Sequence, residues 1–454
     1  MTRPVAAGAP ATAVPGAGVP TRLFHGWRIV AVLAVTETVS WGVLYYAFAV
    51  VQVPMGAELG FSPAVLGGAF SLAVLLTGVA AVPVGRWLDA RGPRGLMSAG
   101  SVVCALLVAA WSQVHTVTGL YLVMAGIGLA RATVLYDPAF AVIVRWFHDR
   151  RAAALLAVTV VAGLASTVAL PASHALIESL GWRDALLVLA GTLAAVTVIP
   201  HWLVLRADPA DLGLHPDGAE QAPPRHPAGR RDERAGGPAA TAGWAVREPV
   251  FRWYAAAFAT HAAAVVIVAV HLVPFLREHG HSAGFAAYAT GALGALSVSG
   301  RLVLTGAVRR VPVAVVTALM FALQGAGVIV LLAAGSSSAG AIAFVLLFGL
   351  GFGVGTIARP ALLAGSFGVA RYATLAGLMT LITTLATTAG PFAAGLARTL
   401  TGSYTPALVG VLVLCAAAAG TLLRAARCAR AEQAGPGPEH RSLGRSQRAL
   451  DSVE

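Results

Sequence analysis

Long apolar runs without charges recur along this chain, and they limit its possible folds more than any other feature. Only 11% of the 454 residues are charged and 57% are hydrophobic, whereas about 25% of residues are charged in an average soluble protein. So few charges cannot cover a water-soluble globule of this size. The composition excludes a soluble enzyme and a disordered chain, and it predicts a protein that crosses the bilayer repeatedly.

Twelve of these runs have the length of about 20 residues that crosses a bilayer. All are predicted to be helices, because lipid offers backbone groups no hydrogen-bond partner outside the helix itself. The expected fold class is therefore all-α integral membrane. The twelve ranges are 27–53, 64–84, 95–114, 119–143, 152–175, 185–205, 254–276, 285–307, 312–334, 339–362, 374–397 and 405–425.

The runs fall into two groups of six, and short motifs repeat between the groups. Residues Pro54, Glu58, Gly60 and Ser62 match residues of the same type 220 positions later, and Asp137-Pro138-Ala139 matches Arg359-Pro360-Ala361 at an offset of 222. Two halves related by a parallel repeat are typical of alternating-access carriers. We expect a flexible cytoplasmic tail (1–24), an N-terminal bundle (25–205), a cytoplasmic linker (206–250), a C-terminal bundle (251–428) and a second flexible cytoplasmic tail (429–454).

The basic residues predict the orientation in the membrane. All 31 are arginines, and they lie between the apolar runs rather than in one patch, which favours a membrane explanation over nucleic-acid binding. With the N-terminus in the cytoplasm, 25 arginines lie on the cytoplasmic side, and three (Arg183, Arg277 and Arg398) lie opposite. The positive-inside rule then predicts cytoplasmic termini and a location in the cell membrane, inner or plasma. The three cysteines have no metal-ligand spacing.

The chain after the second predicted helix reads Gly85-Arg-Trp-Leu-Asp89-Ala-Arg91-Gly92-Pro-Arg94. This segment resembles the loop signature of the major facilitator superfamily. The resemblance implies a fold of two six-helix bundles and a gate formed by these residues, in which the acid latches the halves together when the cytoplasmic side is closed. A carboxylate can accept hydrogen bonds from a helix N-terminus; the alternative is a solvated charged loop. The equivalent loop in the second half has Arg309 and Arg310 and no acid, so the latch is expected to be one-sided.

Further motifs narrow the resemblance. Residues 145–155 (RWFHDRRAAAL), His25-Gly26-Trp27 and Gly300-Arg301 resemble the branch of monocarboxylate porters and oxalate–formate antiporters. The resemblance implies that Arg301 binds a substrate carboxylate, for which its planar fork of donors is suited. The branch usually has an aspartate one turn earlier, where this chain has Ser297, and no lysine is present, so the proton relay of the branch is not carried over. Alternatively, Arg301 snorkels to the cytoplasmic face.

Glu37 and Arg131 are predicted to reach similar depths, about 15 Å and 18 Å into their helices at a rise of 1.5 Å per residue. One hypothesis is an ion pair in the N-terminal bundle in which Glu37 takes up a proton when the pair opens; a static pair that holds helices together is the alternative. Trp41 and Tyr45 share the helix face of Glu37. They are candidates to pack an organic substrate, or they belong to the bundle core.

Two further sites are proposed from the sequence. Asp137 and Arg359 each precede a proline at equivalent places in the repeat, and they are candidates to pair across the halves as an inner gate. His261 is a candidate for proton coupling because histidine titrates near neutral pH, although a lone histidine is more often a hydrogen-bonded core residue.

The embedded charges sum to +1, which favours an anion. The leading hypothesis is a proton-coupled carrier for a small organic anion, a monocarboxylate, that works as a monomer in the lipid bilayer. Its binding site is expected to contain Arg301, Trp41, Tyr45, Arg131 and Ser297, with no cofactor, metal or nucleic acid. The alternative within the class is a proton-driven exporter of amphipathic drugs or metabolites, favoured if Glu37 is unpaired. An integral-membrane enzyme or a sensor is disfavoured, because no catalytic motif and no sizeable soluble domain are found.

Overall fold

A computed structural model describes residues 24–220 and 238–434 of the chain. The predicted flexible tails therefore lie largely outside the described residues. Within those two ranges the chain is helical, with no strand. In the described part of the linker, the regular structure consists of two short 3-10 helices, Pro209–Leu212 and Pro216–Gly218, and the helix α11, Pro238–Arg247.

Twelve helical segments of membrane length follow one another in the described chain, as the apolar runs predict. Those of the first half are α1 (His25–Trp41) with α2 (Ala47–Leu59), α3 (Pro63–Arg91), α4 (Pro93–Trp111), α5 (Val117–Arg131) with α6 (Tyr136–Trp146), α7 (Arg151–Ala162) with α8 (Ala165–Leu180), and α9 (Trp182–Val204). Those of the second half are α12 (Pro249–Glu278), α13 (Ala283–Ala307), α14 (Val313–Ala334), α15 (Ser338–Phe352) with α16 (Gly355–Phe367), α17 (Tyr372–Thr401) and α18 (Thr405–Ala434).

Eleven of the twelve segments meet criteria of length and apolar composition for crossing a membrane. The remaining segment is α13, which contains Arg301 and lies in the second bundle beside α12 and α15. The predicted boundaries agree with the helices to within several residues, and most helices extend further than the apolar run, because polar residues continue them beyond it.

Four of the membrane-length segments are interrupted, and the interruptions occur where polar side chains gather. A π-helix, Gly42–Tyr46, joins α1 to α2, and short irregular stretches separate α5 from α6, α7 from α8 and α15 from α16. Such interruptions leave backbone carbonyl groups without their usual intrahelical partner. They are therefore available to side chains from other helices.

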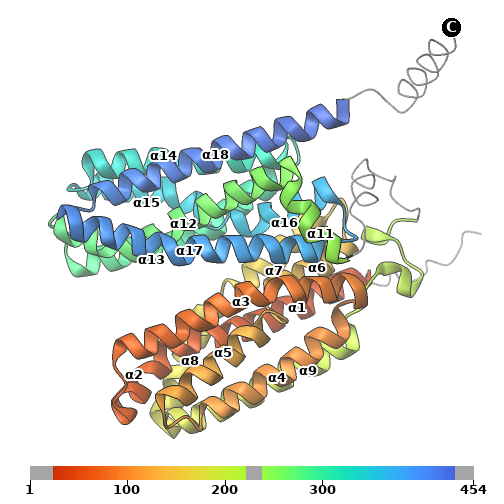
Figure 1. Ribbon diagram of the computed structural model, residues 1–454, viewed down its shortest axis with the longest axis horizontal. Coiled ribbons are helices and arrows are strands. Elements are labelled where there is room, and N and C mark those ends of the chain that lie inside the picture. Colours follow the sequence, from red (N-terminus) through yellow and green to blue (C-terminus); the bar gives the residue numbers. More distant parts are fainter. Residues whose placement is uncertain (1–23, 221–237, 435–454) are drawn as a thin grey trace, which may run out of the picture.

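The helices form two bundles, one from α1 to α9 and one from α12 to α18 (Figure 1). The bundles touch mainly through α3 against α17, with smaller contacts of α6 against α16 and α17 and of α7 against α13 and α16. In Figure 1 they are closest at the end where α6, α7, α11 and α16 lie, and they diverge toward the opposite end. We call the first of these the linker end and the other the far end.

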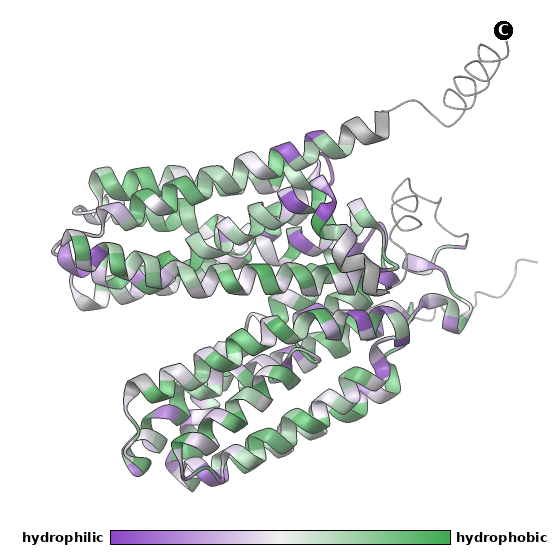
Figure 2. Cartoon of the chain, in the orientation of Figure 1, coloured by the Kyte–Doolittle hydropathy of each residue, from purple (hydrophilic) through white to green (hydrophobic). Residues whose placement is uncertain are grey.

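Apolar residues dominate the membrane-length helices, as Figure 2 shows in green, whereas purple hydrophilic residues gather toward the helix ends. The buried core at the linker end contains residues from both bundles, including Leu88, Trp146, Phe251 and Tyr372. Two further buried clusters each belong to one bundle. Of these three clusters, only the one at the linker end joins the two bundles.

Candidate functional site: a gate at the linker end and isolated charges between the helices

Asp89 at the end of α3 joins the first bundle to the second. Its carboxylate accepts the backbone N–H groups of Ala373 (3.1 Å) and Thr374 (2.7 Å), at the start of α17. It also accepts a hydrogen bond from Arg145 Nη2 at 3.2 Å, and its side chain is only 4% exposed. A carboxylate at this position satisfies N–H groups that the helix leaves free and interacts favourably with the helix dipole. Asp89 is therefore a buried contact between the bundles and not a solvated side chain, whereas its role as a latch stays a prediction.

Two glycines allow α3 and α17 to approach closely. A Cβ atom on Gly85 would lie 2.1 Å from the carbonyl oxygen of Ala373, and one on Gly377 would lie 2.1 Å from that of Ala81. Both distances are far shorter than van der Waals contact. Each helix therefore has a glycine where the backbone of the other passes.

The other residues of the predicted gate contact their own bundle. Arg91 lies over the ring of Trp87 at 4.3 Å, and Arg94 donates to the carbonyl of Trp202 at 2.7 Å. Gly92 has φ +74°, a conformation that favours glycine, and it turns the chain from α3 into α4. Of the motif, the structure therefore brings Gly85 and Asp89 to the boundary between the bundles.

The ion pair expected between Asp137 and Arg359 is present. Arg359 Nη2 lies 3.0 Å from Asp137 Oδ1, and Thr380 Oγ1 of α17 donates to Asp137 Oδ2 at 2.5 Å. Asp137 belongs to the first turn of α6, whereas both partners belong to the second bundle. This contact is a second connection between the bundles. It lies farther from the linker end than that of Asp89, because Asp137 is at the start of α6 and Arg145, the partner of Asp89, is in its last turn.

Glu37 is fully buried, and neither of its oxygens has a hydrogen-bond partner. Ser40 Oγ and Trp41 Nε1, on the same side of α1, are also buried without a partner. The pair predicted between Glu37 and Arg131 is not formed. Helix α1 thus contains a group of polar atoms that are shielded from solvent and lie beside one another, with no well-formed hydrogen bond to another helix in the described part of the chain.

Arg131 has partners other than an acid. Its Nε donates to Thr77 Oγ1 at 2.6 Å, and its Nη1 donates at 3.3 Å to the carbonyl of Leu44, which lies in the π-helix. The guanidinium also lies 5.8 Å from the ring centre of Tyr45. Depth alone therefore does not pair Arg131 with Glu37, because the broken helix offers a carbonyl oxygen instead.

Arg301 reaches across from the second bundle to the first. Its Nη1 donates to the carbonyl of Thr159 in α7 at 2.9 Å, and its Nε donates to the carbonyl of Gly353 at 3.3 Å. Gly353 lies at the interruption of the α15–α16 segment, whereas Thr159 lies in the last turn of α7 and its carbonyl also accepts the N–H of Gly163. No ion pair to Arg301 is found among the described residues. The side chain binds between the bundles and does not snorkel to the linker face.

Aromatic rings surround this central region. Trp41 contacts the rings of Tyr45 and Tyr136 at centroid distances of 5.3 Å and 5.1 Å, and Tyr136 stacks on Phe140 at 4.9 Å. All four residues belong to the first bundle. Trp41 and Tyr45 therefore share a face, as expected, and Tyr136 of α6 completes the group.

Ser297 and His261 are placed differently from the central charges. Ser297 Oγ donates to the carbonyl of Gly294 in its own helix at 2.7 Å. His261 is 5% exposed and stacks on Phe321 at 3.9 Å, inside the second bundle. His261 therefore fits the interpretation as a core residue of the second bundle better than a role between the bundles.

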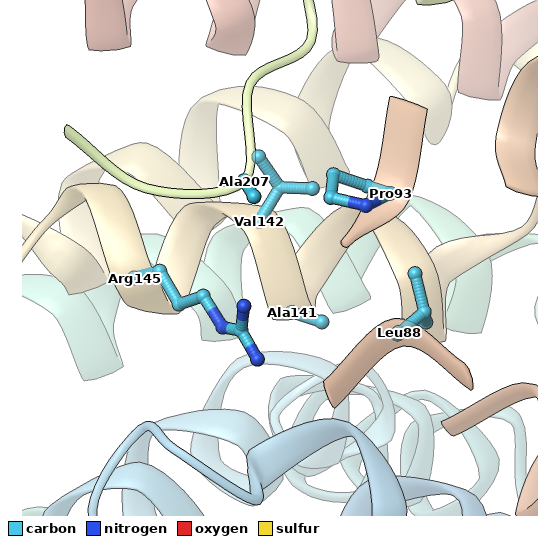
Figure 3. A pocket seen from close by; sticks show the side chains of 6 residues that line it. All are labelled: Leu88, Pro93, Ala141, Val142, Arg145 and Ala207. Carbon is cyan, nitrogen blue, oxygen red and sulfur yellow. The ribbon is translucent and has the colours of Figure 1, made fainter. Parts of the chain in front are cut away.

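A small cavity of about 10 Å³ lies at the linker end (Figure 3). Arg145, Leu88 and Ala207 are among its lining residues, with Pro93, Ala141 and Val142. This volume corresponds to about one water molecule. It is too small for an organic substrate, and it adjoins the Asp89–Arg145 pair rather than the central charges.

Several contributors were missed in the sequence. Arg145 was visible in a motif, but nothing in the sequence indicated that it pairs with Asp89. Thr380 and the carbonyl of Thr159 gave no signal, because a threonine and a backbone oxygen in an apolar helix are ordinary features. Only the packing of distant helices makes them partners.

Comparisons with known proteins agree with this architecture. Residues 30–391 match the family model of the Major Facilitator Superfamily. The E. coli fucose:proton symporter FucP superposes with a TM-score of 0.66 at 16% sequence identity, covering 88% of this chain and 99% of FucP. A second FucP structure, described as being in the outward conformation, has a TM-score of 0.64 at 15% identity and the same coverage. At such identities the similarity is one of fold.

Curated relatives match over shorter stretches. Monocarboxylate transporter 11 of Mus musculus is 31% identical over 208 residues, which are 44% of this chain and 43% of that protein. A probable L-galactonate transporter of Escherichia coli (strain K12) is 26% identical over 162 residues, 35% of each chain. The matches thus span less than half of these relatives. The family model covers most of the chain, however, and the chain therefore belongs to the Major Facilitator Superfamily and is a membrane transporter, not an enzyme.

Proposed function

We propose that this transporter moves a small organic anion with a carboxylate group, coupled to a proton. The observation that carries the proposal is Arg301, a guanidinium between the bundles whose hydrogen bonds go to the backbone carbonyls of Thr159 and Gly353. An arginine is costly at membrane depth and usually serves a transport pathway or an ion pair. A carboxylate is a stronger acceptor than a carbonyl and matches the planar fork of donors.

Unbalanced charge also supports an anion. Asp137 and Arg359 neutralise each other, which leaves Arg131 and Arg301 without acidic partners and Glu37 without a cation. An isolated buried carboxylate is more stable once it has bound a proton. Proton binding at Glu37 would leave two positive charges for the substrate. Proton and anion would then be carried together, with the linker end in the cytoplasm.

Reconstitution in liposomes tests this proposal. Internal pH is followed while a panel of carboxylates is added, and we expect protein-dependent acidification with at least one acid, beyond its passive permeation. Arg301→Ala removes the two charge-assisted hydrogen bonds that the guanidinium would make to the substrate carboxylate, and such bonds contribute about 1.5–3 kcal/mol each. It should therefore weaken apparent affinity at least about tenfold. Arg310 is an exposed arginine just beyond the same helix. The Arg310→Ala variant is therefore the matched control, and it should transport normally. Absence of a signal for every acid would refute anion–proton symport.

A second candidate is a proton-driven exporter of amphipathic drugs or metabolites, and the unpaired state of Glu37 favours it. The carboxyl group lies one turn before Trp41, whose ring packs with Tyr45 and Tyr136. Such a group suits a lipophilic cation, which aromatic faces also attract. Efflux of tetraphenylphosphonium driven by a proton gradient, and abolished in Glu37→Gln, would favour this function over the first.

A further inference from the structure

A residue of the linker, Asp217, binds the start of helix α7. Its Oδ2 accepts the backbone N–H groups of His148 (2.9 Å) and Asp149 (2.7 Å), and its Oδ1 accepts that of Arg150 (3.3 Å). Arg150 is the N-cap residue of α7, and His148 and Asp149 belong to the turn before it; none of their N–H groups has a partner within the helix. The N-cap residue, Arg150, makes no capping bond with its own side chain. The linker therefore holds the turn that leads into α7, up to and including its N-cap residue.

Further hydrogen bonds fix the first residues of the linker, ahead of Asp217. Trp146 Nε1 donates to the carbonyl of Arg206 at 3.2 Å, and Asp211 accepts the N–H groups of Ala207 and Asp208, both at 3.1 Å. Asp217 itself has φ +61°, and it is the one non-glycine residue with positive φ in the described parts of the chain. A left-handed backbone is unfavourable for a residue with a side chain. Its presence at the capping residue indicates that surrounding contacts impose this conformation.

The internal repeat relates this contact to the contact that Asp89 makes with α17. Helices α7 and α17 are equivalent, since each follows the helix that contributes to the Asp137–Arg359 pair. The start of α17 is capped by Asp89 of the opposite bundle. The position equivalent to Asp89, 220 residues later, is the exposed Arg309, which cannot accept hydrogen bonds. At α7 the acid comes from the linker instead, and it binds the turn that precedes the helix rather than its first turn.

We propose that Asp217 is a positioning residue of the gate, which uses the linker to replace the acid missing from the second half. By fixing the loop between α6 and α7, it keeps Arg145, in the last turn of α6, on Asp89 and so stabilises the closed linker end. Arg151 reinforces the loop through bonds to the carbonyls of Phe147 and Val144. The ligand atoms of His148, Asp149 and Asp217 lie within 4.8 Å of one another. Both oxygens of Asp217 already accept N–H groups, so we assign it to capping and not to a metal.

The test uses the full-length protein in lipid nanodiscs, with Cys104, Cys415 and Cys428 replaced by Ala. Spin labels at the exposed positions Arg28→Cys and Arg310→Cys report the distance between the bundles at the linker end. Amide hydrogen exchange at residues 148–150 reports the cap.

We expect Asp217→Ala to speed exchange at these amides about five- to tenfold, the size of effect that follows loss of a helix cap. It should also enlarge the population with longer distances between the labels. Asp217→Asn retains one carbonyl oxygen, so its exchange rate and its distances between the labels should lie between those of Asp217→Ala and the unmodified protein. Asp149→Asn is the matched control, because its side chain does not cap the helix, and it should behave as the unmodified protein.

Two results would overturn the proposal. Unchanged amide exchange in Asp217→Ala would show that Asp217 does not stabilise residues 148–150. Faster exchange with unchanged distances between the labels would show that Asp217 stabilises this turn but has no role in the gate. Adding Arg309→Asp to Asp217→Ala should return both readouts toward their original values; no return would refute the equivalence drawn from the repeat. None of these measurements requires a transported substrate, so the result is independent of the proposed anion.

Discussion

Asp137 connects the two bundles with both of its oxygens, one bound to Arg359 and the other to Thr380. Its removal leaves the arginine without a counter-ion in a site where its side chain is only 19% exposed. Hydrogen bonds to charged groups contribute about 1.5–3 kcal/mol each. A single substitution here should therefore change how often the linker end is closed.

We predict that Asp137→Ala shifts the bundles toward larger separations at the linker end, measured with the spin labels at positions 28 and 310. Exchanging the two residues, Asp137→Arg with Arg359→Asp, should recover part of the closed population, because the ion pair can re-form while the bond from Thr380 is lost. Thr380→Val should have a smaller effect than Asp137→Ala. If the exchanged variant is as open as the single one, the ion pair does not hold the bundles together.

Glu37 offers a different experiment, because its oxygens have no partners to lose. Glu37→Gln keeps the shape of the side chain, so we predict that the free energy of unfolding changes by less than about 1 kcal/mol. Under the proposed coupling, it should abolish uptake driven by a pH gradient while exchange of substrate across the membrane persists. Thermal unfolding and paired uptake and exchange assays measure the two effects. Unimpaired pH-driven uptake in the variant would exclude Glu37 as the coupling residue.

At the scale of elements, the close approach of α3 and α17 depends on glycines rather than on interlocking large side chains. Overpacking a tight contact costs about 1–3 kcal/mol. The carbonyl oxygens opposite Gly85 and Gly377 belong to the helix backbone, which cannot move aside as a flexible side chain would. The two helices must therefore separate if a methyl group is added.

We predict that Gly85→Ala and Gly377→Ala each lower the melting temperature of the detergent-purified protein by at least about 2 °C, and that both increase the distance between the bundles at the linker end. Gly95→Ala is the control, since a Cβ there meets nothing within 4 Å. Equal melting temperatures for all three variants would show that the α3–α17 contact contributes little to stability.

At the scale of the whole molecule, the bundles bond across their boundary through Asp89 at the linker end and through Asp137 and Arg301 farther from that end. These contacts stabilise one conformation of a carrier that must open alternately toward each side. With the linker end in the cytoplasm, as the distribution of arginines predicts, this conformation is closed toward the cytoplasm.

The orientation can be measured directly. In the cysteine-free protein, we predict that a membrane-impermeant maleimide labels Ser336→Cys, at the far end, in intact cells. Gly95→Cys, at the linker end, should react only after the membrane is permeabilised. Both positions are exposed in the structure. The reverse pattern of labelling would place the termini outside the cell and contradict the arginine count.

The sequence by itself determined the class of fold, the twelve helices, the repeat and the embedded charges. These properties follow from apolar runs and from the cost of charge in lipid, which act locally along the chain. The pairing of Asp137 with Arg359 could also be predicted, because the repeat places both at the same depth. Each of these inferences needs only spacing along helices of known geometry.

The tertiary structure alone decided which partners the remaining charges have. Arg131 and Glu37 reach similar depths, yet Arg131 binds the carbonyl of Leu44 in a π-helix, and Arg301 binds one carbonyl in the last turn of α7 and one between α15 and α16. Asp217 binds the turn before α7 only because the linker folds back over that turn. Backbone oxygens have no sequence signature, and their availability depends on where helices break and how the bundles pack; the sequence therefore indicates which charges are buried, but not what neutralises them.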